Sequence, residues 1–255
     1  AVESAARMRS FDPVRTYLEG LIWDQEPRLD DWLADYFGAP KTEYTMRVGR
    51  WWLIGMVRRV FEPGCKFDFM PILEGPQGRG KSSALEILAH PWFGNTDFVM
   101  GDKDSMSVMQ GKWLYEVAEL DSFNKADSTR VKSFVSRQID EFRPPYGRRV
   151  VKQPRRVVLV GTTNQYEYFK DASGNRRFWP IQCLETINLD GLREARDQLF
   201  AEAVHRYRAG ERSYPTREEQ EELLAPEQEA RILLNLRPAL HPEGEIVYVQ
   251  HGARR

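Results

Sequence analysis

The chain has 255 residues, and its 37 lysines and arginines against 38 aspartates and glutamates give a formal charge of −1 at pH 7. A chain without net positive charge has no global attraction for nucleic acid, so any contact with DNA must be local. No apolar run reaches the length of a membrane span and no signal peptide is visible, which argues against a membrane protein. Cys65 and Cys183 lie outside any metal-binding spacing, which indicates a reducing compartment. Because the chain opens without methionine, we expect a domain cut from a longer protein, and simple removal of the first methionine is the alternative.

The N-terminal part predicts three helices. Asp12-Pro13 is an N-cap followed by proline at the first helical position, and apolar stripes follow over residues 14–22, 29–37 and 46–61. The last stripe carries the arginines Arg47, Arg50, Arg58 and Arg59. We expect these arginines to be the solvated face of a packed helix, and contact with DNA is the alternative.

A phosphate-binding pattern follows an apolar run over residues 67–73. From Gly75 the chain reads G-x-x-x-x-G-K-S, and residues 82–89 then open a helix. Glycines let a backbone wrap an anion, and the helix would direct free N–H groups at the phosphates. The alternative is a glycine-rich surface turn. The predicted nucleotide-binding residues are Gly75, Pro76, Gln77, Gly78, Arg79, Gly80, Lys81, Ser82 and Ser83, with Lys81 on the β/γ-phosphates and Ser82 on Mg²⁺.

A second apolar run, residues 112–121, ends in acids. A P-loop enzyme needs a neighbouring strand with a carboxylate for Mg²⁺ or the attacking water. We expect Glu119 in this role because it stands where the strand should end, with Asp121 just beyond it. Glu116 is a rival, although it lies within the strand.

After a predicted helix over residues 125–138, residues 140–152 predict a hairpin, because two extended runs flank Pro-Tyr-Gly. An aromatic residue and three cations gather at and after this turn: Tyr146, Arg148, Arg149 and Lys152. Stacking combined with phosphate neutralisation is how proteins hold a single nucleic-acid strand. A charged hairpin edge in solvent is the alternative.

Residues 156–161 predict a third core strand, ending in Thr162-Thr163-Asn164. The amide of Asn164 could orient the attacking water, whereas an ordinary asparagine turn is the alternative. Arg176 and Arg177 then follow a Gly-Asn turn before an apolar strand. A loop arginine beyond the core is where an arginine finger would lie, and a pair of surface cations is the other interpretation.

The C-terminal part predicts a helical stripe over residues 192–207 that stops at Gly210, and then a second helix that opens with a Thr216/Glu219 capping box and breaks near Pro226. Residues 246–249 predict a terminal strand. We divide the chain into an N-terminal helical region (1–64), a P-loop core (65–185) and a C-terminal helical region with a terminal strand (186–255), all within one compact unit.

Five of these blocks, in this order, resemble the virulence-associated protein E family: the P-loop, the tryptophan-led strand ending at Glu119-Leu120-Asp121, and residues 143–148, 161–164 and 174–180. That family is similar to superfamily 3 helicases and phage-type primase-helicases. The resemblance covers residues 67–181, and the terminal helical regions match no motif.

The resemblance implies an α/β fold, namely an AAA+-related P-loop ATPase core with helical flanks. It also implies ATP and Mg²⁺ as cofactors, single-stranded DNA as partner, a homo-oligomeric, hexameric ring, and work on phage or mobile-element DNA in the bacterial cytoplasm. A primase domain precedes the helicase in many relatives.

The resemblance also assigns roles to residues. Glu119 would be the Walker B acid, Asn164 the sensor 1 group and the hairpin the pore element that grips DNA. Arg176 or Arg177, with Arg177 preferred, would act on the ATP of a neighbouring subunit. Ser82, Glu119 and Asp121 would serve the metal, and because Leu120 separates the two acids their division of labour is open.

We therefore expect a DNA helicase or translocase. One rival is an ATP-dependent regulatory or immunity switch without motor activity. The other is a small-molecule kinase, which would need a lid and an acceptor pocket that no residues suggest.

Overall fold

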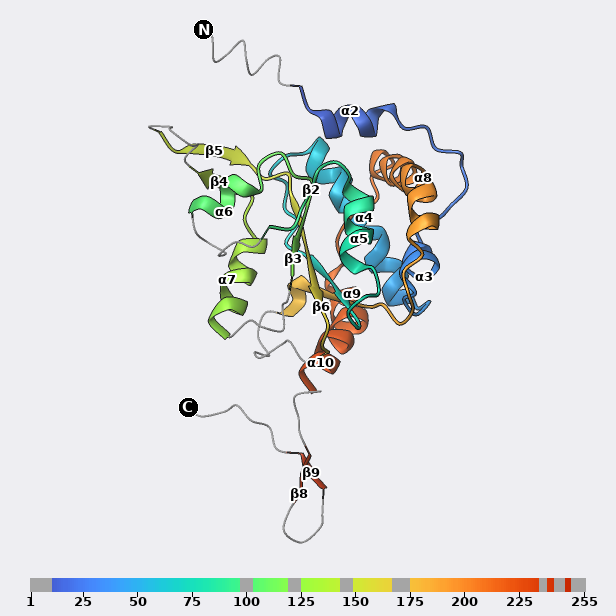
Figure 1. The fold of residues 1–255 in the computed structure, drawn as a ribbon, viewed down its shortest axis with the longest axis vertical. Helices are drawn as coiled ribbons and strands as arrows, with labels where there is room; N and C mark the ends of the chain where they lie inside the picture. Colours follow the sequence, from blue (N-terminus) through green and yellow to red (C-terminus); the bar gives the residue numbers. More distant parts are fainter. Residues whose placement is uncertain are drawn as a thin grey trace.

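The computed structural model describes residues 11–96, 103–118, 125–142, 149–166, 175–233, 238–240 and 246–248. In this part of the chain, a parallel five-stranded sheet lies between two layers of helices (Figure 1). Its strands, in spatial order, are β2 (Phe93–Gly94), β3 (Leu114–Val117), β6 (Val158–Thr163), β1 (Met70–Glu74) and β7 (Phe178–Gln182). The fold is therefore of the α/β class that the sequence predicts.

The helices divide between the two faces of the sheet. They are α2 (Pro13–Gly20), α3 (Trp32–Phe37), α4 (Glu43–Phe61), α5 (Lys81–Ala89), α6 (Lys103–Val108), α7 (Lys125–Val135), α8 (Leu189–Arg208), α9 (Arg217–Glu219) and α10 (Ala225–Leu233). Side chains of β1 alternate between two hydrophobic clusters, since Leu73 packs with α2 to α5 and α8, whereas Met70 and Ile72 pack with α6 and α7. Both faces of the sheet are thus covered, as parallel strands require.

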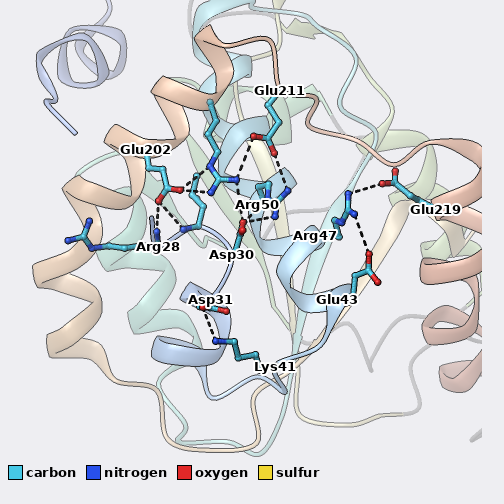
Figure 2. A network of polar contacts seen from close by, with 12 residues as sticks. Arg28, Asp30, Asp31, Lys41, Glu43, Arg47, Arg50, Glu202, Glu211 and Glu219 are labelled. Atoms are coloured by element: carbon cyan, nitrogen blue, oxygen red, sulfur yellow. Dashed lines mark hydrogen bonds and ion pairs between the residues drawn. The ribbon is translucent and has the colours of Figure 1, made fainter. Parts of the chain in front are cut away.

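The N-terminal helices belong to the larger cluster, in which α4 packs against α3 and α8. Figure 2 shows how ion pairs fasten this layer: Arg50 on α4 meets Asp30 and Glu211, and Arg47 meets Glu43 and Glu219. The prediction of a packed helix is therefore confirmed, but Arg47 and Arg50 are half-buried in ion pairs and do not form the freely solvated face that the sequence predicted.

Arg59 differs from the solvated residue that the sequence analysis expected. Its side chain is buried, and its guanidinium donates to the carbonyls of Arg155 and Phe67. Burial lowers its pKa to about 10. Arg59 thus joins α4 to the sheet and offers no surface charge.

The predicted hairpin is confirmed by the antiparallel pair β4 (Ile139–Phe142) and β5 (Val151–Pro154). Its base is anchored because the buried Arg155 donates to Asp140 across the hairpin and to the carbonyl of Phe134 on α7. The tip, residues 143–148, lies outside the described residues.

The C-terminal helices correct one expectation. The Thr216/Glu219 capping box is present, but the helix does not break near Pro226. Instead, a π turn at Gln220–Leu224 joins α9 to α10 without interruption. Proline lacks a backbone donor and clashes with the preceding turn of an α-helix, and the wider π turn accommodates both defects. Beyond it, β8 (Pro238–Leu240) pairs antiparallel with β9 (Ile246–Tyr248), so the predicted terminal strand is present.

Candidate nucleotide-binding site

The predicted phosphate-binding loop joins β1 to α5 at the carboxyl edge of the sheet. Its glycines Gly75, Gly78 and Gly80 have φ of 152°, 82° and 89°, in the region that side chains disfavour. At Gly75 a Cβ atom would also lie 2.7 Å from the carbonyl oxygen of Cys183. The glycine pattern is therefore a backbone requirement of this turn. The first amides of α5, which follow directly, have no acceptor within their helix and can bind an anion.

The ammonium group of Lys81 lies inside the curve of this loop. It donates to the carbonyls of Gly75 (2.6 Å) and Pro76 (3.0 Å) and to Oδ1 of Asn164 (3.1 Å). Burial lowers the pKa of Lys81, while the nearby Cys183 and Glu116 oppose that shift. The three acceptors of Lys81 among the described residues are all neutral, so this desolvated cation is a strong site for a phosphate group.

A buried carboxylate stands beside the first turn of α5. Oε1 of Glu116 on β3 accepts from Oγ of Ser82 at 2.7 Å and from Oγ1 of Thr162 at 2.7 Å. Glu116 is 3 % exposed, so two hydroxyls replace the water that its charge would otherwise bind. Three strands and α5 thus bring a lysine, a serine, a carboxylate and an amide together at one edge of the sheet.

These groups line one cavity of about 400 Å³, a volume within the range of nucleotide and other small-molecule sites. It is bounded by Gln77, Gly78, Arg79, Gly80, Lys81, Ser82, Ser83, Glu116, Ala118, Thr162, Thr163 and Asn164. The described residues contain no cluster of three or more His, Cys, Asp or Glu side chains that could hold a metal by themselves. One carboxylate beside one hydroxyl suits Mg²⁺, which proteins commonly bind together with substrate phosphates.

The predicted site residues fall into two groups. The loop, Lys81, Ser82 and Asn164 converge on the cavity, whereas Glu119 and Asp121 lie outside the described residues, so their roles remain predictions. The acid that the structure places beside Ser82 is Glu116, the rival that the sequence analysis set aside as mid-strand.

The sequence analysis set Glu116 aside as a rival and gave Thr162 no role of its own. Strand alternation could have found Glu116, since Tyr115 and Val117 pack with α6 and α7, and the residue between them must face α5.

The two candidate finger residues lie at the opposite edge of the sheet. They end a short 3₁₀ turn, Asn175–Arg177, directly before β7, whose Phe178 pairs with Met70 at the start of β1. The P-loop begins after the end of β1, roughly 13 Å further along the strand. Arg177 donates to Oγ of Ser136 at 2.8 Å, whereas Arg176 is exposed.

Of the predicted DNA contacts, Tyr146 and Arg148 lie outside the described residues. Arg149 is exposed next to β5. Lys152 is exposed on β5 and pairs at 2.8 Å with Glu141, its neighbour across the hairpin, which raises its pKa. The hairpin thus offers Arg149 as an available cation, while part of the charge of Lys152 is already compensated.

A family model for the virulence-associated protein E-like domain matches residues 18–232. The chain belongs to this family. The match extends well beyond residues 67–181, so it includes α3 and α4 and most of the C-terminal helices. The comparison with curated proteins found no match.

Solved structures of the C-terminal region of NrS-1 share the fold of this virulence-associated protein E-like domain. One has a TM-score of 0.59 at 13 % identity and covers 84 % of this chain, and a second has a TM-score of 0.54 at 12 % identity and covers 87 %. The alignments span 53 % and 57 % of those chains, so the present chain corresponds to about half of each. Within the described part of the chain, no helix is long and apolar enough to cross a membrane.

Proposed function

We propose that this domain binds ATP with Mg²⁺ at the cavity around Lys81, hydrolyses it and uses the energy to move along or melt DNA. The observation that carries the proposal is the convergence of Lys81, Ser82, Glu116 and Asn164 on one cavity at the carboxyl edge of the sheet. Phosphoryl transfer needs little covalent chemistry from a protein. It needs cations, amides and a carboxylate held in position, which this edge provides.

Each residue has a distinct part in this proposal. Lys81 exchanges its carbonyl partners for the β/γ-phosphates, and the first amides of α5 bind the same group. Ser82 and Glu116 would hold Mg²⁺, which neutralises the phosphate charge when bound. Asn164, which already contacts Lys81, would orient the attacking water near the γ-phosphate. Glu119, two residues beyond the end of β3, stays our proposal for the carboxylate that polarises this water.

The 3₁₀ turn Asn175–Arg177, called the arginine turn below, supports action between subunits. Arg176 and Arg177 lie at the edge of the sheet opposite to their own P-loop, so a cis contact would have to span the sheet. In a ring, the same turn can reach the site of a neighbouring subunit. Arg176 becomes the preferred finger, because Arg177 already bonds Ser136.

Single-stranded DNA remains the proposed partner, with the hairpin of β4 and β5 as the element that grips it. The anchored base supports this assignment, because Arg155 ties Asp140 on β4 to α7 through buried hydrogen bonds, so the hairpin strands would move together with the core. A homo-oligomeric ring, a preceding primase domain and the bacterial cytoplasm belong to the same proposal and rest on family membership.

Strand displacement tests the proposal against its main rival, a nucleotide-dependent switch. The protein is mixed with a forked duplex carrying a single-stranded tail, with either ATP or a non-hydrolysable analogue, and ATP turnover is measured with and without the tail strand. A motor releases the strand only with ATP and turns over faster with DNA. Turnover without strand release or DNA stimulation would favour the switch.

A further inference from the structure

The base of the phosphate-binding loop is held by a buried ion pair from the C-terminal helix. Glu74, the last residue of β1, is fully buried, and Arg231 on α10 binds it with Nε at 2.9 Å and Nη2 at 2.8 Å. The second amino group of Arg231 binds Glu227 at 3.0 Å. Such a two-pronged contact fixes orientation as well as distance.

The backbone of Glu74 and Gly75 links this pair to the lysine of the site. The carbonyl of Glu74 accepts the N–H of Cys183 at 2.7 Å, and the carbonyl of the next residue, Gly75, accepts Nζ of Lys81 at 2.6 Å. A shift of the Glu74 side chain would turn the peptide that holds Lys81. Arg231 is thus connected to the phosphate-binding group through Glu74 and Gly75, and it does not itself line the cavity.

The same helix also holds the arginine turn. One turn before Arg231, the buried Gln228 donates to the carbonyl of Phe178 at 2.9 Å, and its own oxygen accepts from Gln220 at 3.1 Å. Phe178 directly follows Arg176 and Arg177. Contacts between α10 and the 3₁₀ turn accompany this bond.

We propose that α10 is a positioning element that links the phosphate-binding loop of a subunit to the arginine turn that it presents to its neighbour. Arg231 sets the loop and Gln228 sets the turn, so a change at one end of the helix reaches the other. In this way the nucleotide in one subunit would adjust the finger that acts on the next. The inference rests on the proposed function, because it assigns α10 to the regulation of that site.

Arg231→Lys tests the loop end of α10, because lysine keeps the charge beside Glu74 but cannot make the forked contact. Binding of a fluorescent ATP analogue should weaken on the order of 10-fold, as expected when a positioning contact is lost. The matched control is Arg206→Lys, since Nε and Nη2 of Arg206 both donate to Oε1 of a fully buried carboxylate, Glu202, which does not line the cavity and is labelled in Figure 2. The control should lose thermal stability and keep its affinity. Equal affinity losses in both variants, or none in Arg231→Lys, would overturn this half.

Gln228→Leu tests the other end. It should lower kcat for ATP while leaving KM near the wild-type value, because the arginine turn acts in the transition state and the loop is unchanged. A merely structural role would lower the fraction of folded protein and leave kcat per folded molecule unchanged, so folded protein is quantified beside each rate. Wild-type kcat in Gln228→Leu overturns this half.

The result for the wild-type chain separates the inference from the proposed function. If the wild type turns over ATP, and the affinity of Arg231→Lys and the kcat of Gln228→Leu equal the wild-type values, the inference alone is rejected. Wild-type binding without turnover rejects the proposed function together with the role of Gln228, and Arg231→Lys still decides the loop end. Absence of wild-type binding rejects both.

Discussion

Oγ of Ser82 and Oε1 of Glu116 lie 2.7 Å apart, and this hydrogen bond joins the first turn of α5 to β3, the strand between β2 and β6. A serine at this position of the loop and a carboxylate on a neighbouring strand are the two protein groups that a nucleotide-bound Mg²⁺ requires. Among the residues that the structure describes, Glu116 is therefore the acid that lies beside the proposed position of the metal.

We predict that Glu116→Gln lowers kcat for Mg²⁺-dependent ATP hydrolysis on the order of 10²-fold, because the site loses the negative charge that attracts the metal. Glu119→Gln should bind ATP normally and also lose turnover, because its proposed role is in hydrolysis. Steady-state phosphate release and binding of an ATP analogue measure both variants. If Glu119→Gln keeps full turnover while Glu116→Gln is inactive, Glu116 both holds the metal and polarises the attacking water.

The arginine turn gives a second prediction. Arg176→Ala should bind ATP and lose about 10³-fold or more in turnover, the range of an arginine finger. Mixing it with Lys81→Ala should restore part of the activity, because some junctions then join an intact loop to an intact arginine. Arg177→Ala, mixed in the same way, separates the two residues. If mixed rings form and neither mixture recovers, the arginines do not act between subunits.

The hairpin prediction concerns salt dependence. Arg148→Ala/Arg149→Ala should reduce the slope of log affinity against log salt for single-stranded DNA by roughly 1.4, from two lost phosphate contacts at about 0.7 each. Arg217→Ala is the control, because Arg217 is an exposed arginine on α9 that lies outside the hairpin and pairs with Glu221 of the π turn. Equal slopes for the wild type and the double variant would remove the hairpin from the DNA site.

Glu219 provides a pH test of the helical layer. Burial opposes its ionisation, but hydrogen bonds from Arg212 and the Thr216 amide outweigh this effect and lower its pKa. A lowered folded-state pKa adds stability above the usual carboxyl pKa, and this stability is lost as the pH falls through the folded value. Glu219→Gln should therefore lower Tm at pH 7, and the difference should shrink below about pH 4. A constant difference across the pH series would contradict the assignment.

Local patterns predicted most of the core. The glycines of the loop, the capping box at Thr216 and the pairing of β4 with β5 each depend on residues close in sequence, so the chain alone reveals them. Glu116 was set aside because a strand was expected to deliver its acid at the end. β3 is only four residues long, however, and alternation turns Glu116 toward α5.

The remaining features depend on partners distant in sequence. Ser136 engages Arg177 across 41 positions, and Arg231 reaches Glu74 across 157. No periodicity marks either contact. The continuity of α9 and α10 past Pro226 depends in the same way on a π turn that the apolar stripe does not specify.

The central claim, that the cavity around Lys81 hydrolyses ATP, is tested most directly by phosphate release from the wild type and from Lys81→Ala under saturating ATP and Mg²⁺. Lys81→Ala loses the cation that contacts Gly75, Pro76 and Asn164, so the account predicts turnover in the wild type and none in the variant. Equal phosphate release by the two folded proteins, or none by the wild type in the presence of single-stranded DNA, would contradict it.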